Sequence, residues 1–181
     1  FGGGTPSLLT ERELSQILNQ LSKHFDLATN IECTLEANPD DLSKDYLRML
    51  VRRGVNRLSI GVQSFFDEDL VFMNRSHTSS QAKNVIEMAK QAGISNLSVD
   101  LIFGYTLLSD EKLNANLQEL IKRNVPHISC YAMTVEPRTA LAHLIRTKKI
   151  QDVNPEQSAR QYEFVSQKLQ QAGFEHYEIS N

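Results

Sequence analysis

The sequence predicts an α/β fold with a parallel sheet, because strand-like apolar runs alternate with amphipathic helical segments along its 181 residues. Several strand-like runs are apolar on consecutive residues, which is typical of strands covered by helices on both faces. Polar residues gather where those strands are expected to end. Together these features predict a ligand site at the carboxyl ends of the strands.

Each helix is predicted from a start signal or a stop signal around an apolar face. Thr10 and Glu13 form a capping-box pattern at the start of the first helix. Gly54 and Gly93 are expected to end the second and third helices as left-handed caps. In chain order, the helices are expected to begin at Thr10, Ser43, Ser80, Asp110 and Asn154, the last of which precedes a proline.

The strands are predicted from apolar runs rich in β-branched and aromatic residues. The expected strands span 31–36, 57–63, 97–103, 127–133 and 174–179. Gly2 to Gly4 resemble the loop that follows a strand, and the chain stops just after its last expected strand. We therefore expect one domain over residues 1–181 that forms a partial parallel (β/α) barrel, truncated at both ends.

Composition and charge argue against several function classes. The net charge is -3 and no basic run exceeds two residues, so there is no electrostatic footprint for nucleic acid or anionic membranes. No apolar run approaches the roughly 20 residues of a membrane span. Cys33 and Cys130 are too few for a disulfide framework and are expected to be buried reduced thiols, which favours a cytoplasmic protein. No histidine pair has the spacing of a helical metal site.

The polar residues at the expected strand ends have competing interpretations. The glycines could let the backbone approach a ligand, but they lack the Gly-Lys-Ser/Thr ending of a phosphate loop and could equally form a plain turn. Glu36 could be an exposed capping acid, and Arg75 taken alone a solvated charge. Asp100 is flanked by apolar residues and requires a partner, which favours a role in a site. Among the histidines, His77 is the one expected to face that site.

Several segments resemble one known family along the entire chain. Their order and spacing identify the chain as similar to the coproporphyrinogen-III-oxidase-like family of radical S-adenosylmethionine (SAM) proteins. The segments are Phe1 to Ser7, Glu36 to Pro39, Gly54 to Phe65, Asp100 to Gly104, His127 to Tyr131, Glu136-Pro137 and Tyr177 to Asn181.

Within that family, the residues of these segments resemble the heme chaperone branch more than the oxygen-independent oxidase. The chain has Glu-Ala-Asn-Pro at 36–39, Ser64 after Gln63, and Tyr-Glu-Ile-Ser-Asn at its end. It departs from the family at Tyr105 and Thr106, where Leu-Pro is usual, and at Arg138, where glycine is common.

The resemblance implies a set of cofactors and contacts. It implies SAM, a [4Fe–4S] cluster whose cysteine ligands lie outside this chain, and heme as a further ligand. The C-terminal heme-binding segment is also expected to lie outside it. No residue of the chain is expected to ligate a metal or to act as a catalytic group itself. The implied SAM-binding residues are Gly4, Thr5, Gln63, Arg75, Asp100 and Ala132, with Gly3 and Glu36 at positions that meet a second SAM in the oxidase.

Three functions remain open from the sequence. The first is a heme chaperone that binds heme and delivers it to acceptor proteins. The second is oxidative decarboxylation of coproporphyrinogen III by a coproporphyrinogen dehydrogenase. The third is a noncatalytic α/β binding module. Whether the protein is an enzyme therefore stays undecided, and heme or a porphyrinogen is the expected partner.

Overall fold

The computed structural model describes residues 1–179 and divides into two compact units. The first unit comprises residues 1–100 and 125–128, and the second comprises 101–124 and the chain from 129 onward. The division passes through the third and fourth strands, so each unit contains part of the sheet.

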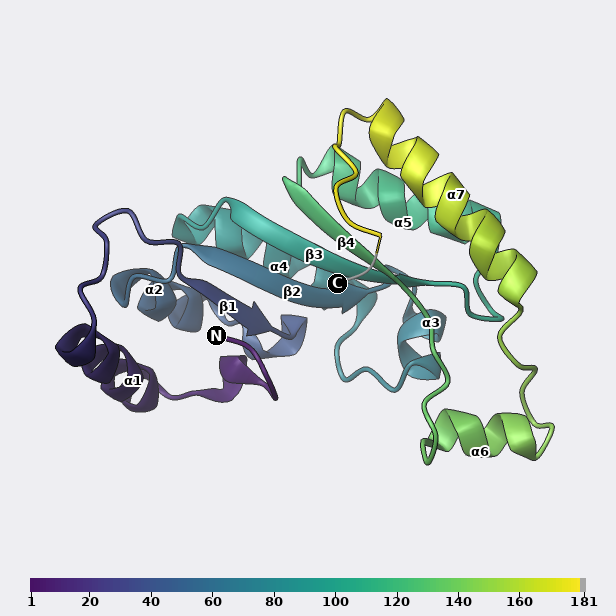
Figure 1. Cartoon of the computed structure of the whole chain (residues 1–181), viewed down its shortest axis with the longest axis horizontal. Helices are drawn as coiled ribbons and strands as arrows, with labels where there is room; N and C mark the ends of the chain where they lie inside the picture. Colours follow the sequence, from purple (N-terminus) through teal and green to yellow (C-terminus); the bar gives the residue numbers. More distant parts are fainter. Residues whose placement is uncertain (180–181) are drawn as a thin grey trace. The chain divides into compact units, whose positions relative to one another are not determined.

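The sheet has four strands that lie side by side in sequence order (Figure 1). They are β1 (Thr34–Ala37), β2 (Arg57–Gln63), β3 (Asn96–Phe103) and β4 (His127–Ala132). β1 and β2 are parallel, with Leu35 opposite Leu58 and Ala37 opposite Ile60. A helix lies in every connection between consecutive strands, as parallel neighbours require. The predicted α/β class with a parallel sheet is confirmed.

Helices lie before, between and after these strands. In chain order they are η1 (Pro6–Leu8), α1 (Glu11–His24), η2 (Pro39–Asp41), α2 (Lys44–Arg52), α3 (Asp67–Phe72), α4 (Ser79–Ala92), α5 (Asp110–Lys122), α6 (Ala140–Arg146) and α7 (Pro155–Gln171). In the first unit, α2 contacts α4, and in the second α5 contacts α7. Leucine side chains of β1, β2 and α2 are completely buried in the first core, as are Leu117 and Leu120 of α5 in the second.

Phe1 continues the parallel pairing beyond β1. Its amino group donates to the Thr34 carbonyl oxygen over 2.6 Å, and its own carbonyl accepts the Glu36 N–H over 3.0 Å. Bonding to the two residues that flank Leu35 is the parallel hydrogen-bond pattern. The glycines that follow Phe1 therefore begin at the edge of the sheet where β1 ends.

Most predicted helix signals are present, with small shifts. The capping box of Thr10 with Glu13 forms as expected, and Gly54 and Gly93 adopt positive φ angles of 86° and 105°. The third helix begins at Ser79, after a Thr78 cap. Asp110 was wrongly expected to cap the fourth helix; Ser109 does so, since its side chain accepts the Lys112 N–H.

Two parts of the sequence interpretation were wrong. The described residues 174–179 contain no strand, and Tyr177 and Ile179 are 65% and 84% exposed. An apolar run becomes a strand only where a neighbouring edge offers hydrogen bonds, and periodicity alone does not reveal that edge. The short helices α3 and α6 were missed, because six or seven residues hold too few turns for a periodic pattern.

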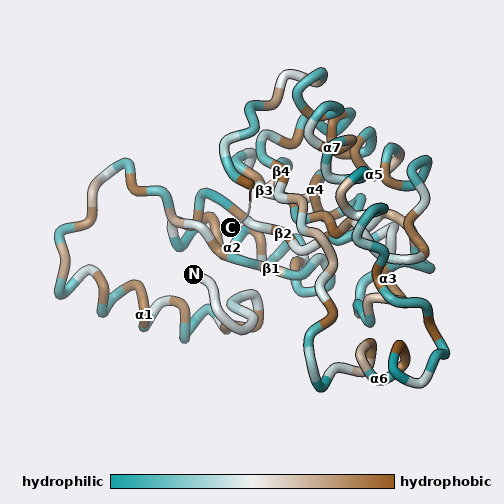
Figure 2. Tube along the Cα trace, turned by 45° about the vertical axis from the view of Figure 1, so that its right-hand side comes forward, coloured by the Kyte–Doolittle hydropathy of each residue, from teal (hydrophilic) through white to brown (hydrophobic). Residues whose placement is uncertain are grey.

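The apolar face of α1 forms as predicted but is largely exposed. Figure 2 shows hydrophobic and hydrophilic residues alternating along this helix. Leu14 is buried, whereas Ile17, Leu21 and Phe25 are 37%, 36% and 62% exposed. Among residues 1–179, no helix is long and apolar enough to span a membrane.

Gln161 should be a stability determinant of the second unit. Its side chain is fully buried, accepts the Gly104 N–H over 3.0 Å and donates to the Leu108 carbonyl over 3.0 Å. Gln161→Leu leaves both groups without that partner and should lower the free energy of unfolding by about 2–4 kcal/mol. Gln167→Leu, at an exposed position of the same helix, should change it by less than about 0.5 kcal/mol. Urea unfolding followed by circular dichroism compares the two, and equal effects would contradict the assignment.

Candidate functional site

The glycine loop after Phe1 exposes its backbone. Gly3 and Gly4 have φ angles of 80° and 81°, in the left-handed region that favours glycine. A Cβ atom built on either residue would meet nothing within 4 Å. Thr5 is also exposed, and its side chain makes no capping hydrogen bond to η1. The backbone of this loop is therefore accessible to a ligand.

Glu36 lies against this loop. A Cβ built on Gly2 would be 2.5 Å from Glu36 Oε1 and 2.8 Å from its Cδ, so the carboxylate occupies the space that a side chain at position 2 would need. Glu36 is exposed in β1. The structure thus brings the glycine loop and one of the two predicted carboxylates together.

Gln63 ends β2 in a constrained position. Its side chain is buried, its φ angle is 68°, and its Oε1 has no hydrogen-bond partner among residues 1–179. The amide nitrogen lies over Gly61, since a Cβ there would be 2.9 Å from Gln63 Nε2 and 3.8 Å from Asn38 Oδ1. A buried acceptor without a donor costs about 1–3 kcal/mol, so this oxygen is suited to accept a hydrogen bond from a ligand.

Arg75 and Asp100 interact electrostatically. Burial lowers the pKa of the Arg75 guanidinium, and the negative charge of Asp100 opposes that shift. Asp100 lies three residues before the end of β3 and is half-buried, as is Arg75. The pair places a fixed positive charge and a carboxylate in the same region of the first unit.

Hydrogen bonds join the loops at this edge of the sheet. Ser7 of η1 donates to Asp41 over 2.5 Å, and Ser76 donates to Asp40 over 2.7 Å. His77 is buried, with its Nε2 3.0 Å from the Val62 carbonyl oxygen. The segments after Phe1, β1 and β2 therefore converge, as expected for the carboxyl ends of parallel strands. We call Gly3, Gly4, Thr5, Glu36, Gln63, Arg75 and Asp100 the rim.

Ala132 belongs to the second unit. It is the exposed last residue of β4, and the following Met133 N–H donates to the Phe103 carbonyl over 2.8 Å. Ala132 thus lies at the carboxyl end of its strand. Elsewhere in the second unit, Tyr105, one of the residues that depart from the family pattern, is fully buried. The Thr106 hydroxyl beside it donates to the Gln151 carbonyl over 3.3 Å.

The described residues offer no obvious metal centre. Within residues 1–179, no group of three or more His, Cys, Asp or Glu side chains could hold an ion. Cys33 and Cys130 are half-buried, less buried than expected. Desolvation raises the pKa of the Cys33 thiol, which favours its neutral form.

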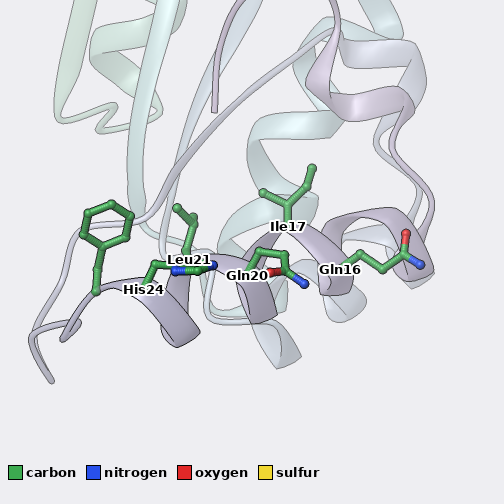
Figure 3. A pocket seen from close by; sticks show the side chains of 6 residues that line it. Gln16, Ile17, Gln20, Leu21 and His24 are labelled. Atoms are coloured by element: carbon green, nitrogen blue, oxygen red, sulfur yellow. The ribbon is translucent and has the colours of Figure 1, made fainter.

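A shallow apolar pocket is lined by residues that do not belong to the rim. Figure 3 shows its lining side chains, all from α1 and the residue after it. They are Gln16, Ile17, Gln20, Leu21, His24 and Phe25. Because a single helix supplies the whole lining, the pocket is an exposed helix face without converging polar groups.

Sequence reasoning missed three residues near Gln63. Asn38 lies beside Gly61, and the buried Ser64 hydroxyl donates to the buried Asp69 carboxylate over 2.8 Å. The Ser64 to Asp69 spacing carries no recognisable pattern. Asn38 lies within the Glu36 to Pro39 segment, directly after the first strand. That position was the one sequence signal that could have assigned it to the site.

Comparison with known proteins identifies the family. Residues 1–120 match the Radical SAM superfamily. The chain belongs to this superfamily. It is 33% identical over its whole length to "Heme chaperone HemW" of Lactococcus lactis and 35% identical to that of Bacillus subtilis. It spans about half the length of these relatives, 48% in both cases.

A solved structure shows the same fold. The "Coproporphyrinogen III oxidase (HemN) from Escherichia coli" matches 99% of this chain with a TM-score of 0.84 and 25% identity, over 41% of its own length. The resemblance to the coproporphyrinogen-III-oxidase-like family, nearest its heme chaperone branch, is confirmed. The sheet corresponds to part of that radical SAM fold.

His77 should make stability depend on pH. Burial lowers its pKa, and Arg75 adds to this, while the Val62 bond and Asp40 oppose it. Below about pH 6.5 the unfolded chain protonates this histidine more readily than the folded chain does. The free energy of unfolding should therefore decrease as the pH falls below that value. His77→Gln should reduce the loss between pH 7.5 and 5.5 by about 1 kcal/mol. Urea unfolding at both pH values checks this, with the exposed His24→Gln as control. An unchanged pH dependence would contradict it.

Proposed function

We propose that the protein binds SAM at the rim and acts as a heme chaperone. The observation that carries the SAM assignment is the buried Gln63 Oε1 without a donor, at an edge that also holds a glycine loop, an arginine and two carboxylates. Buried acceptors without a hydrogen-bond donor are uncommon in native proteins, and a donor on a ligand would supply the missing bond here.

The chemistry of SAM matches this set of groups. The ligand carries an ammonium, a carboxylate, ribose hydroxyls and an adenine ring. The Arg75 guanidinium would take the carboxylate, for which its planar fork is suited. The open backbone of Gly4 and Thr5 would meet the ammonium, while Gln63 and Asp100 would accept from hydroxyl or amino groups. Ala132, in the second unit, is the residue that the resemblance assigns to the adenine.

Gly3 and Glu36 have a separate proposed role. The sequence resemblance places them near a second SAM, and Glu36 lies against the glycine loop. A carboxylate beside exposed backbone suits an ammonium or sulfonium group. We therefore assign these two residues to the outer part of the same rim.

The [4Fe–4S] cluster would be held by cysteines outside these 181 residues. When bound, such a cluster supplies the single electron that cleaves SAM. The residues described here would bind and orient SAM beside it. Cys33, just before β1, and Cys130 of β4 are not proposed as its ligands.

The chaperone assignment follows the relatives. Identity to the two named heme chaperones is 33% and 35%, against 25% for the coproporphyrinogen III oxidase. The oxidase remains the second candidate, because its structure matches 99% of this chain with a TM-score of 0.84. For a chaperone, heme would be the ligand and heme-accepting proteins the partners. For the oxidase, a porphyrinogen would be the substrate. The low cysteine count, two in 181 residues, supports a reducing, cytoplasmic setting.

Asp100→Asn should weaken SAM binding more than it weakens the fold. Removing the charge beside Arg75 should raise the SAM dissociation constant by about tenfold, the equivalent of about 1.4 kcal/mol. The melting temperature should stay within a few degrees of wild type. Calorimetric titration of the anaerobically reconstituted full-length protein tests this. Asp45→Asn, whose side chain is 93% exposed, is the matched control and should change neither value. A collapse of stability with unchanged SAM affinity would assign Asp100 to structure instead.

The full-length protein should bind heme and fail to convert coproporphyrinogen III. The test is an anaerobic incubation with coproporphyrinogen III, SAM and a reductant, beside a spectroscopic heme titration. Heme binding without turnover supports the chaperone. Catalytic formation of protoporphyrinogen IX would replace it by the oxidase. A protein that binds SAM but neither cleaves it, binds heme nor converts coproporphyrinogen III would be better explained as a noncatalytic module.

A further inference from the structure

Gln63 sits at the centre of an unusual tight turn. The Ser64 N–H donates to the Val62 carbonyl oxygen over 2.8 Å, across a single residue, while Gln63 has a φ angle of 68°. Such a γ-turn with positive φ is rare and strained. A glutamine adopts this backbone only where surrounding contacts over-determine it.

The surrounding contacts come from buried polar side chains. His77 Nε2 lies 3.0 Å from the same Val62 oxygen, and because a carbonyl only accepts, the ring nitrogen must carry the proton. Ser64 donates its hydroxyl to Asp69 over 2.8 Å and accepts the Phe66 N–H over 3.2 Å. His77 is 3% exposed, and Ser64 and Asp69 are completely buried. The Val62 carbonyl thus uses both acceptor positions, one for the turn and one for His77.

The turn decides where the Gln63 amide points. In a regular strand, side chains alternate between the two faces of the sheet, so an extended Gln63 would project differently. In the turn its amide nitrogen lies over Gly61, and Oε1 is left without a donor among the described residues. Loss of the turn would therefore misplace the buried Gln63 Oε1, which the rim needs as an acceptor for a ligand.

The same histidine anchors the loop that carries Arg75. The backbone N–H of Arg75 donates to the Leu70 carbonyl over 2.8 Å, and Ser76 binds Asp40 over 2.7 Å. The charged groups that act on the ring are Asp40 from η2 and Arg75 from its own loop. His77 therefore ties the end of β2 to the loop of the rim guanidinium.

We propose that His77 is a positioning residue for SAM binding, which fixes Gln63 through its hydrogen bond to the Val62 carbonyl. This inference rests on the proposed function, in which Gln63 contacts SAM. His77 itself is not proposed to touch the ligand.

The experiment uses the anaerobically reconstituted full-length protein and two readouts. Hydrogen exchange of the Ser64 amide reports on the turn without any ligand, and calorimetry gives the dissociation constant of SAM. His77→Phe keeps the ring shape but removes the donor, and His77→Gln keeps a donor. Should Phe prevent folding, His77→Leu takes its place. His24→Phe, at an exposed site, is the matched control.

His77→Phe should speed Ser64 exchange and raise the SAM dissociation constant by about tenfold, as loss of a ligand's outer hydrogen-bond partner does in metal sites. His77→Gln should restore most of the affinity. In a Gln63→Ala background, His77→Phe should have no further effect, because the group that it positions is gone. A merely structural role would give the same loss in both backgrounds.

Three results would overturn the inference. Unchanged exchange and affinity in His77→Phe would show that the bond holds nothing. An equal loss in the Gln63→Ala background would show that His77 acts elsewhere. If exchange accelerates but neither His77→Phe nor Gln63→Ala alters SAM affinity, the assignment of Gln63 to SAM fails and the role of His77 in binding fails with it. In that case His77 still holds the turn in the wild-type protein, because its loss accelerates exchange. That result separates this outcome from the first.

Discussion

Parallel pairing in sequence order is the constraint on which the rest of the structure depends. It begins with Phe1, whose two hydrogen bonds to the backbone of β1 follow the parallel pattern, and continues with Leu35 opposite Leu58. Parallel neighbours require a crossover between strands, and helices fill those crossovers. All the connecting loops that follow the strands consequently emerge at one edge, and the rim is assembled there from segments far apart in the sequence.

Strain at this edge is concentrated in a few residues. Gly3 and Gly4 adopt left-handed angles without steric cost, whereas Gln63 adopts one with a full side chain. The difference is informative. A glycine at position 63 would relieve the backbone but remove the amide, so the strained conformation is retained together with the group that it orients. Buried hydrogen bonds from Ser64 and His77 hold it in place.

The rim carries charges of both signs, one guanidinium and two carboxylates. Arg75 is drawn toward its neutral form by burial and toward its charged form by Asp100. Glu36 remains exposed beside the glycine loop, at the outer part of the same edge. A molecule with both an ammonium and a carboxylate matches this division better than a simple anion such as phosphate. The membership of the chain in the radical SAM superfamily agrees with that chemistry.

The sequence by itself determined the fold class, most of the helix caps and the family. Those features depend on local periodicity, on single residues such as Gly54, and on ordered motifs, all of which can be read along the chain. It also placed Glu36 and Gln63 at strand ends. Tertiary structure alone decided that residues 174–179 form no strand and that the apolar face of α1 stays exposed, because both depend on which surfaces meet. It alone revealed that His77 and Ser64 share the Val62 carbonyl, since no local pattern links a histidine to a carbonyl fifteen residues away.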